Sequence, residues 1–154
     1  PDKASELTDI IMEWANQNEG VELNMEKSSK SYIRFTTKAM SEILPNAEGY
    51  RSGWGTENFY FYEIKNNIGK EFFIQLIFSS SGIPDKLRTI CDKVNDFYPA
   101  KMKKDNWQWR TPYSTKHFKF NDENYDEQEI FQHLDKMLEQ VKTFEKDLKS
   151  QLRL

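Results

Sequence analysis

The feature that most constrains the fold is an aromatic hairpin in the middle of the chain. Residues 58–79 read NFYFYEIKNNIGKEFFIQLIFS, two aromatic and aliphatic runs on either side of the turn Asn66-Asn67-Ile68-Gly69. Because successive residues of a strand point to opposite faces, each run places apolar side chains on both of its faces. This pattern favours a central hairpin covered on two sides over an edge hairpin with one wet face.

The rest of the chain alternates between helical and strand patterns. We expect helices over residues 5–17, 37–44, 84–97 and 126–152, and short strands at 21–24 and 31–36. Residues 107–120, WQWRTPYSTKHFKF, predict a further strand. Pro112 interrupts this strand and lacks an amide hydrogen, so we expect the strand to lie at an edge of the sheet or to carry a bulge.

This order of elements predicts an α+β fold in one domain, residues 1–154. We expect a mostly antiparallel sheet around the central hairpin, helices largely on one side of it and a long C-terminal helix. That helix would be about 39 Å long, longer than the rest of the domain needs. We therefore expect its end, residues 145–154, to pack on a partner, as in a homodimer, or on a neighbouring domain. The chain opens at Pro1 without an initiator methionine, which fits a fragment of a longer protein.

Several kinds of site and location are excluded or disfavoured by the residue types present. Cys91 is the only cysteine, which excludes an internal disulfide and favours a reducing, cytoplasmic setting. His117 and His133 are the only histidines and are too far apart to predict a zinc site. No apolar run reaches the length of a membrane span, so we expect no membrane association. The chain also lacks a phosphate-binding glycine loop and a nucleophile elbow.

The first candidate site is the triplet Glu63-Ile64-Lys65 at the end of the first hairpin strand. A carboxylate and a lysine two residues apart on a strand share a face, as in the PD-(D/E)XK nucleases. One alternative is therefore a magnesium-dependent nuclease with Glu63 and Lys65 as catalytic residues. Such a site needs a second acid, and the upstream candidates Glu48 and Glu57 do not occupy a suitable strand. We favour a structural role for Glu63 and Lys65, with no cofactor.

The second candidate site is a basic and aromatic segment. Residues 84–120 carry nine Lys or Arg and four Asp, within a chain of net charge -3. Cations interleaved with aromatic rings are typical of single-stranded nucleic-acid binding. The candidate binding residues are Lys101, Lys103, Lys104, Trp107, Trp109, Arg110 and Lys116. Trp107 and Trp109 share a strand face, however, and burial in the core is favoured for them. Trp54, between Gly53 and Gly55, is predicted to be a lid on the core.

Four segments, in this order, resemble one known domain: YFYEIKN with FFIQLIF, then PDKLRTICDKV, NWQWRTPYSTKHF and DEQEIFQHLDKMLEQVKTFEKDL. They are similar to an accessory domain that follows the nuclease domain in some bacterial PD-(D/E)XK-type defence and restriction-like proteins. The similarity spans roughly Tyr32 to Leu148. In that family the catalytic acid and lysine lie in a separate upstream domain. The resemblance therefore implies that this chain has no catalytic site, and it brings no ligand with it.

Three functions follow from these patterns. The leading one is a non-catalytic accessory domain of a bacterial nuclease or phage-defence protein. Such a domain would engage DNA, RNA or a partner protein, including an upstream nuclease domain, through the basic region 101–119. The second is the small metal-dependent nuclease. The third is a structural interaction module that dimerises through its C-terminal helix.

Overall fold

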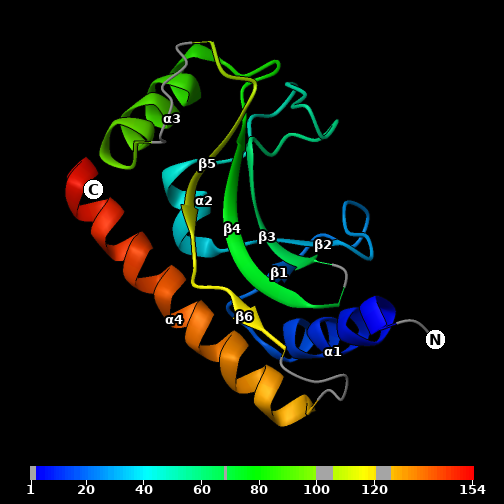
Figure 1. The fold of residues 1–154 in the computed structure, drawn as a ribbon. Helices are drawn as coiled ribbons and strands as arrows, with labels where there is room; N and C mark the ends of the chain where they lie inside the picture. The colour runs from blue at the N-terminus through cyan, green and yellow to red at the C-terminus, as the bar shows by residue number, and fades with distance from the viewer. Residues whose placement is uncertain (1–2, 68, 100–105, 121–125) are drawn as a thin grey trace.

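The computed structural model describes residues 3–67, 69–99, 106–120 and 126–154, and its centre is an antiparallel sheet (Figure 1). The described strands are β1 (Glu22–Leu23), β2 (Tyr32–Thr36), β3 (Tyr60–Asn67), β4 (Glu71–Ser79), β5 (Trp109–Ser114) and β6 (Phe118–Lys119). They are ordered β1-β2-β3-β4-β5, and β6 also pairs with β4. The aromatic hairpin, β3 and β4, therefore lies in the middle of the sheet, which confirms the prediction.

The described helices are α1 (Lys3–Gln17), α2 (Lys38–Ile43), α3 (Asp85–Phe97) and α4 (Glu127–Leu152). Side chains define where two of them begin. Thr37 accepts a hydrogen bond from the amide of Met40 at the start of α2, and Asp126 accepts from the amide of Gln128 at the start of α4. None of the described helices combines the length and the hydrophobicity that crossing a membrane requires.

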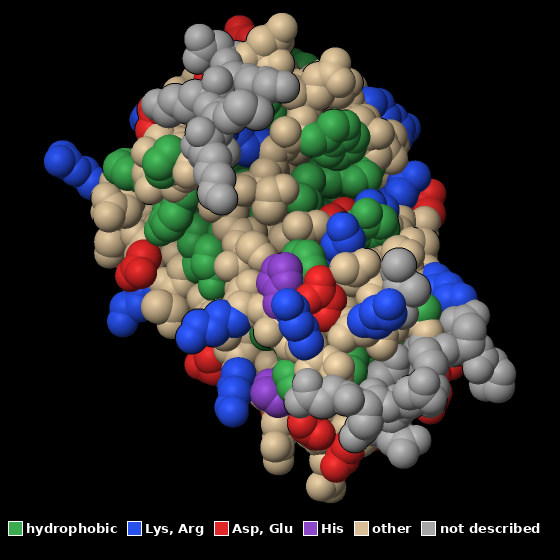
Figure 2. All heavy atoms as spheres, viewed as in Figure 1, with side chains coloured by type: hydrophobic (Ala, Val, Ile, Leu, Met, Phe, Trp, Pro, Cys, Tyr) green, Lys and Arg blue, Asp and Glu red, His purple; other side chains and the backbone are tan. Residues whose placement is uncertain are grey.

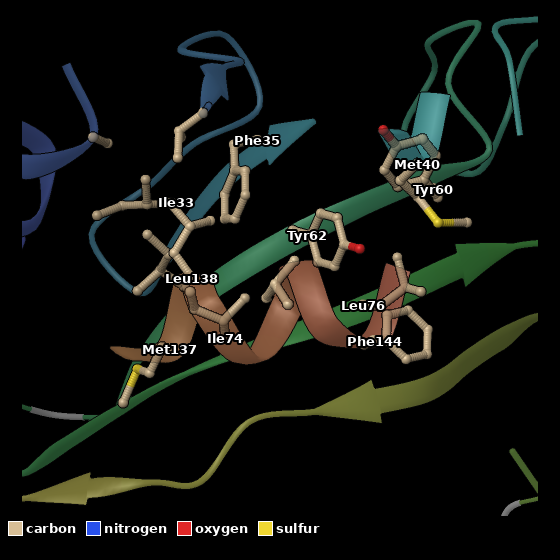
Figure 3. Packing of buried hydrophobic residues seen from close by; sticks show 14 of the residues in the cluster. Ile33, Phe35, Met40, Tyr60, Tyr62, Ile74, Leu76, Met137, Leu138 and Phe144 are labelled. Carbon is tan, nitrogen blue, oxygen red and sulfur yellow. The ribbon is translucent and has the colours of Figure 1, made fainter. Parts of the chain in front are cut away.

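One face of the sheet packs against helices to form the core (Figure 3). Alternate residues of the central strands point into this core, among them Ile33, Phe35, Tyr60, Tyr62, Ile64, Phe72, Ile74, Leu76 and Phe78. α4 supplies Met137, Leu138 and Phe144 to the same cluster, and α1 contacts both α4 and the sheet. The predicted α+β class, with a long C-terminal helix, is confirmed.

The apolar stripe of α4 is buried by the chain itself from Ile130 to Leu148, and Leu152 beyond it is half-buried. Its core residues are Ile130, Leu134, Met137, Leu138, Val141, Phe144 and Leu148, all at most 4% exposed. Near the end of the helix, the ammonium group of Lys149 lies 2.9 Å from a carboxylate oxygen of Glu42 in α2. Most of α4 therefore packs within the domain itself, and packing of its end, residues 145–154, on a partner or in a homodimer stays a prediction.

The predicted strand over residues 107–120 is two shorter strands at the edge of the sheet. β5 contains Pro112, and its register with β4 shifts between Leu76 and Phe78, which marks a bulge. Between β5 and β6, the Thr115 hydroxyl accepts a hydrogen bond from the amide of Ile74 at 3.0 Å. The edge position and the irregularity expected from Pro112 are both present.

A buried carboxylate on α4 joins three elements of the core. Glu145 is 5% exposed, and the hydroxyl groups of Tyr62 and Thr37 both donate hydrogen bonds to its Oε2. The Tyr62 bond is 2.9 Å long. Burial raises the pKa of Glu145 and that of Tyr62. The sequence pattern does not reveal this network, because Glu145 is one of many acids on α4.

Candidate functional site on the open face of the sheet

The sheet has a second face, turned away from the helical core, which we call the open face. Its side chains are Tyr32, Arg34, Phe61, Glu63, Lys65, Phe73, Gln75, Ile77, Trp109 and Thr111, which alternate with the core residues of β2 to β5. A hollow of about 470 Å³ lies on this face. It is lined by Tyr32, Arg34, Gly53, Trp54, Glu63, Gln75, Ile77, Trp109 and Thr111. Figure 2 shows hydrophobic side chains gathered over the upper part of β4 and the loop beside it, with charged side chains around them.

The floor of the hollow is a polar ladder across three strands. The sheet register places Arg34 of β2 opposite Glu63 of β3, and Glu63 opposite Gln75 of β4. The Nε of Arg34 lies 2.6 Å from Oε2 of Glu63, and the amide of Gln75 donates to Oε1 at 3.0 Å. Arg34 also donates to the carbonyl of Lys27 at 2.8 Å. Both carboxylate oxygens of Glu63 therefore accept hydrogen bonds, and the guanidinium of Arg34 compensates the negative charge. Glu63 as a whole is only 4% exposed.

The nuclease alternative requires Glu63 to bind a metal ion. A cation at this carboxylate would have to displace Arg34, because the guanidinium already occupies Oε2. Glu57 instead accepts a hydrogen bond from the amide of Gly49 at 2.6 Å, and Glu48 is exposed in the loop before β3. Among the described residues, no three or more His, Cys, Asp or Glu side chains are grouped as metal ligands would be. These positions favour the structural role for Glu63.

Two tryptophans form the wall of the hollow. Trp54, from the loop before β3, packs edge-on against both Phe61 and Trp109, each with 4.9 Å between ring centroids. A Cβ atom at Gly53 would come within 2.7 Å of the Trp109 ring, so glycine is needed for this close approach. Trp54 is half-buried and covers the fully buried Phe61, as a lid would, but on the open face and not on the main core cluster. Trp109 is 50% exposed, so the expectation of a buried Trp109 is wrong.

The cations of the open face gather around one tyrosine. The ring centroid of Tyr32 lies 5.1 Å from Cζ of Arg34 and 5.7 Å from Nζ of Lys65. Arg34 is paired with Glu63, whereas Lys65, next to the hollow, forms no ion pair with another described residue. The site thus combines an exposed ring for stacking, a cation for an anion, and the polar side chains of Gln75 and Thr111.

The basic and aromatic segment predicted from the sequence is divided between the interior and the surface. Trp107 is 7% exposed. The Cζ atom of Arg88 lies over the Trp107 ring, 4.7 Å from the ring centroid. Arg110 is 8% exposed and donates to the backbone carbonyls of Asn95 and Tyr98 at 3.4 and 3.3 Å. Trp107 and Arg110 therefore support α3, and burial keeps both from forming an exposed binding surface.

The remaining members of the predicted set have different positions. Lys101, Lys103 and Lys104 lie outside the described residues. Lys116 is exposed, and its backbone amide donates to the side chain of Gln140 in α4 at 3.2 Å. Of the predicted binding residues that the structure describes, only Trp109 lines the hollow, and Glu63 from the other candidate site lines it too.

Arg34 and Gln75 are site residues that the sequence pattern did not identify. A clue was present, because Arg34 is the only charged residue in the strand YIRFT and Glu63 is the only acid in YFYEIKNN. Opposite charges in two apolar strands favour a buried pair. The partner could not be assigned, however, because the register between β2 and β3 is not encoded in either segment alone.

Comparison with models of known protein families, with curated proteins and with solved structures finds no match to this chain. The resemblance to a nuclease-associated accessory domain therefore stays a prediction.

Proposed function

We propose that this chain is a non-catalytic binding domain whose open face holds single-stranded nucleic acid. The single observation that carries the proposal is the half-exposed ring of Trp109, beside Trp54, above the polar floor of the hollow. The accessory role implied by the sequence resemblance agrees with this function. In that role the chain would hold a strand while a separate domain acts on it.

The chemistry of the open face suits an unpaired base. Stacking of one base on an aromatic side chain contributes about 1–3 kcal/mol and tolerates any sequence, since every base has a π-face. In a duplex the faces of the bases are already stacked on their neighbours, so Trp109 could stack only on bases that are splayed out. Lys65 can contact a phosphate, and the side chains of Gln75 and Thr111 can bond to base edges. The hollow, about 470 Å³, is of the size that binds small planar groups.

A titration of oligothymidylate and of duplex DNA at low salt tests the proposal. We expect the single strand to bind and Trp109→Ala to weaken binding roughly tenfold or more. Phe97→Ala is the matched control, because Phe97 is also exposed but ends α3. Lys65→Gln should lower the slope of log affinity against log salt concentration by about 0.7. Absence of binding, or equal affinity of the Trp109 and Phe97 variants, would overturn the proposal.

A cleavage assay with magnesium or manganese separates this proposal from the nuclease alternative. We expect no cleavage that depends on Glu63, because Arg34 and Gln75 occupy both carboxylate oxygens. Cleavage by the wild-type chain that is lost in Glu63→Gln would replace the binding function with a catalytic one.

A further inference from the structure

A second hollow, independent of the open face, lies between the helices. It has a volume of about 530 Å³ and is formed by α2, the loop that follows α2, α3 and the end of α4. Most of its lining is apolar and includes Ile43, Pro45, Ala47, Leu87, Ile90 and Leu152. We call it the helical groove. It shares no lining residue with the hollow on the open face.

The charged side chains of the helical groove have an ordered arrangement. Lys86 and Lys93 line it from α3 and are exposed. They are seven residues apart, so they lie on the same side of α3, about 10 Å apart along its axis, with Ile90 between them. Neither lysine forms an ion pair within the described part of the chain. Glu42, the acid that lines the groove, is already paired with Lys149 at 2.9 Å.

This arrangement gives the groove a positive rim on a chain whose net charge is -3. Two cations spaced by two helical turns, on either side of a half-buried isoleucine, match an elongated partner better than a compact small molecule. The complementary surface has apolar side chains in the middle and acids two turns apart, which is the surface of an amphipathic helix.

We propose that the helical groove binds an acidic amphipathic helix of a partner protein. Its apolar side chains would lie against Ile90 and Leu152, and two acids seven residues apart would face Lys86 and Lys93. The proposal does not depend on nucleic-acid binding at the open face.

Two synthetic helical peptides with identical apolar positions test this interface by fluorescence anisotropy. One carries glutamate and the other lysine at two positions seven residues apart. We expect wild-type protein to prefer the acidic peptide by roughly five- to tenfold at low salt, a preference that falls as salt increases. The double substitution Lys86→Glu with Lys93→Glu should reverse the preference. The control Lys136→Glu with Lys146→Glu makes the same change of charge at exposed positions of α4 and should leave the preference intact.

A third variant separates the groove from charge alone. Ile90→Arg should abolish binding of both peptides. This result counts only if the variant still unfolds cooperatively on heating. The charge-reversal variant changes two exposed positions and tests the interface independently of Ile90. Binding of neither peptide to wild-type protein would overturn the proposal, as would an equal preference in the charge-reversal and control variants. A concentration-dependent dimer in sedimentation that Ile90→Arg dissociates would assign the groove to a second copy of this chain instead.

Discussion

In the described part of the chain, one buried carboxylate lies against each face of the sheet, and the two are compensated in different ways. On the open face, Glu63 is held by the guanidinium of Arg34 and the amide of Gln75. On the core face, Glu145 is held by the hydroxyl groups of Tyr62 and Thr37. Both residues are almost fully buried, at 4% and 5% exposure. Equal burial thus does not imply equal electrostatics, because Glu63 is hydrogen-bonded to a cation, whereas the hydrogen bonds to Glu145 come from neutral hydroxyl groups.

The difference bears on function as well as on stability. The paired charges of Arg34 and Glu63 form a neutral, preorganised floor under the half-exposed Trp109. The hydroxyl groups around Glu145 join α4 to β3 and to the start of α2, deep in the core, and the open-face hollow does not include them. The proposed ligand binding therefore lies on the open face, and the core-face network joins the helices to the sheet.

The largest effect is expected from removing the cation of the open face. Arg34→Met leaves Glu63 buried without a compensating charge, which should lower the free energy of unfolding by about 3–5 kcal/mol. The double variant Arg34→Met with Glu63→Leu removes both charges and should recover most of that loss. Urea unfolding of the two variants measures both values. A loss below about 1 kcal/mol for Arg34→Met would show that Glu63 does not depend on this cation.

A smaller effect is expected from removing one donor of the core-face acid. Tyr62→Phe deletes the 2.9 Å hydrogen bond to Glu145, and a bond to a charged group contributes about 1.5–3 kcal/mol. Tyr113→Phe is the matched control, because the Tyr113 hydroxyl makes no hydrogen bond within the described residues. Urea unfolding at neutral pH should separate the two variants. Equal stability would mean that the Tyr62 hydroxyl does not support Glu145.

The pH dependence of stability tests the same acid without removing a donor. The pKa of Glu145 in the folded protein is raised above 4.5 by burial, so the folded state binds the proton more tightly than the unfolded state. This group therefore lowers stability progressively as the pH rises from about 4.5 through its raised pKa, by at most about 1.4 kcal/mol for each unit of pKa difference. Glu145→Gln keeps an oxygen for the two hydroxyl groups and should remove this dependence. Thermal unfolding between pH 4 and pH 8 compares the two proteins, and parallel pH profiles would contradict the assignment.

Particular residues show how far the sequence could predict this molecule. The apolar stripe from Ile130 to Leu152 repeats with the helical period, and the aromatic runs on either side of Gly69 repeat with the strand period. Both signals are local, so the long helix and the hairpin were predictable. The pairing of Arg34 with Glu63 was not, since it depends on the register between two strands that the short helix α2 separates in sequence. The prediction that Trp109 is buried failed for another reason. β5 begins at Trp109, so strand alternation does not extend back to Trp107, and the two rings need not share a face.

Of these two tryptophans, Trp109 gives the smallest expected effect on stability. Trp109 is half-exposed and contacts Trp54 at its edge, so Trp109→Ala should lower the free energy of unfolding by about 1 kcal/mol. Trp107 is 7% exposed, and its ring lies 6.4 Å from that of Phe78 in the core, so Trp107→Ala should cost about 3 kcal/mol or more. Urea unfolding measures both. If Trp109→Ala loses little stability but much oligothymidylate affinity, the Trp109 ring acts in binding. If the two variants lose equal stability, Trp109 is a packing residue, and the distinction between the two faces is removed.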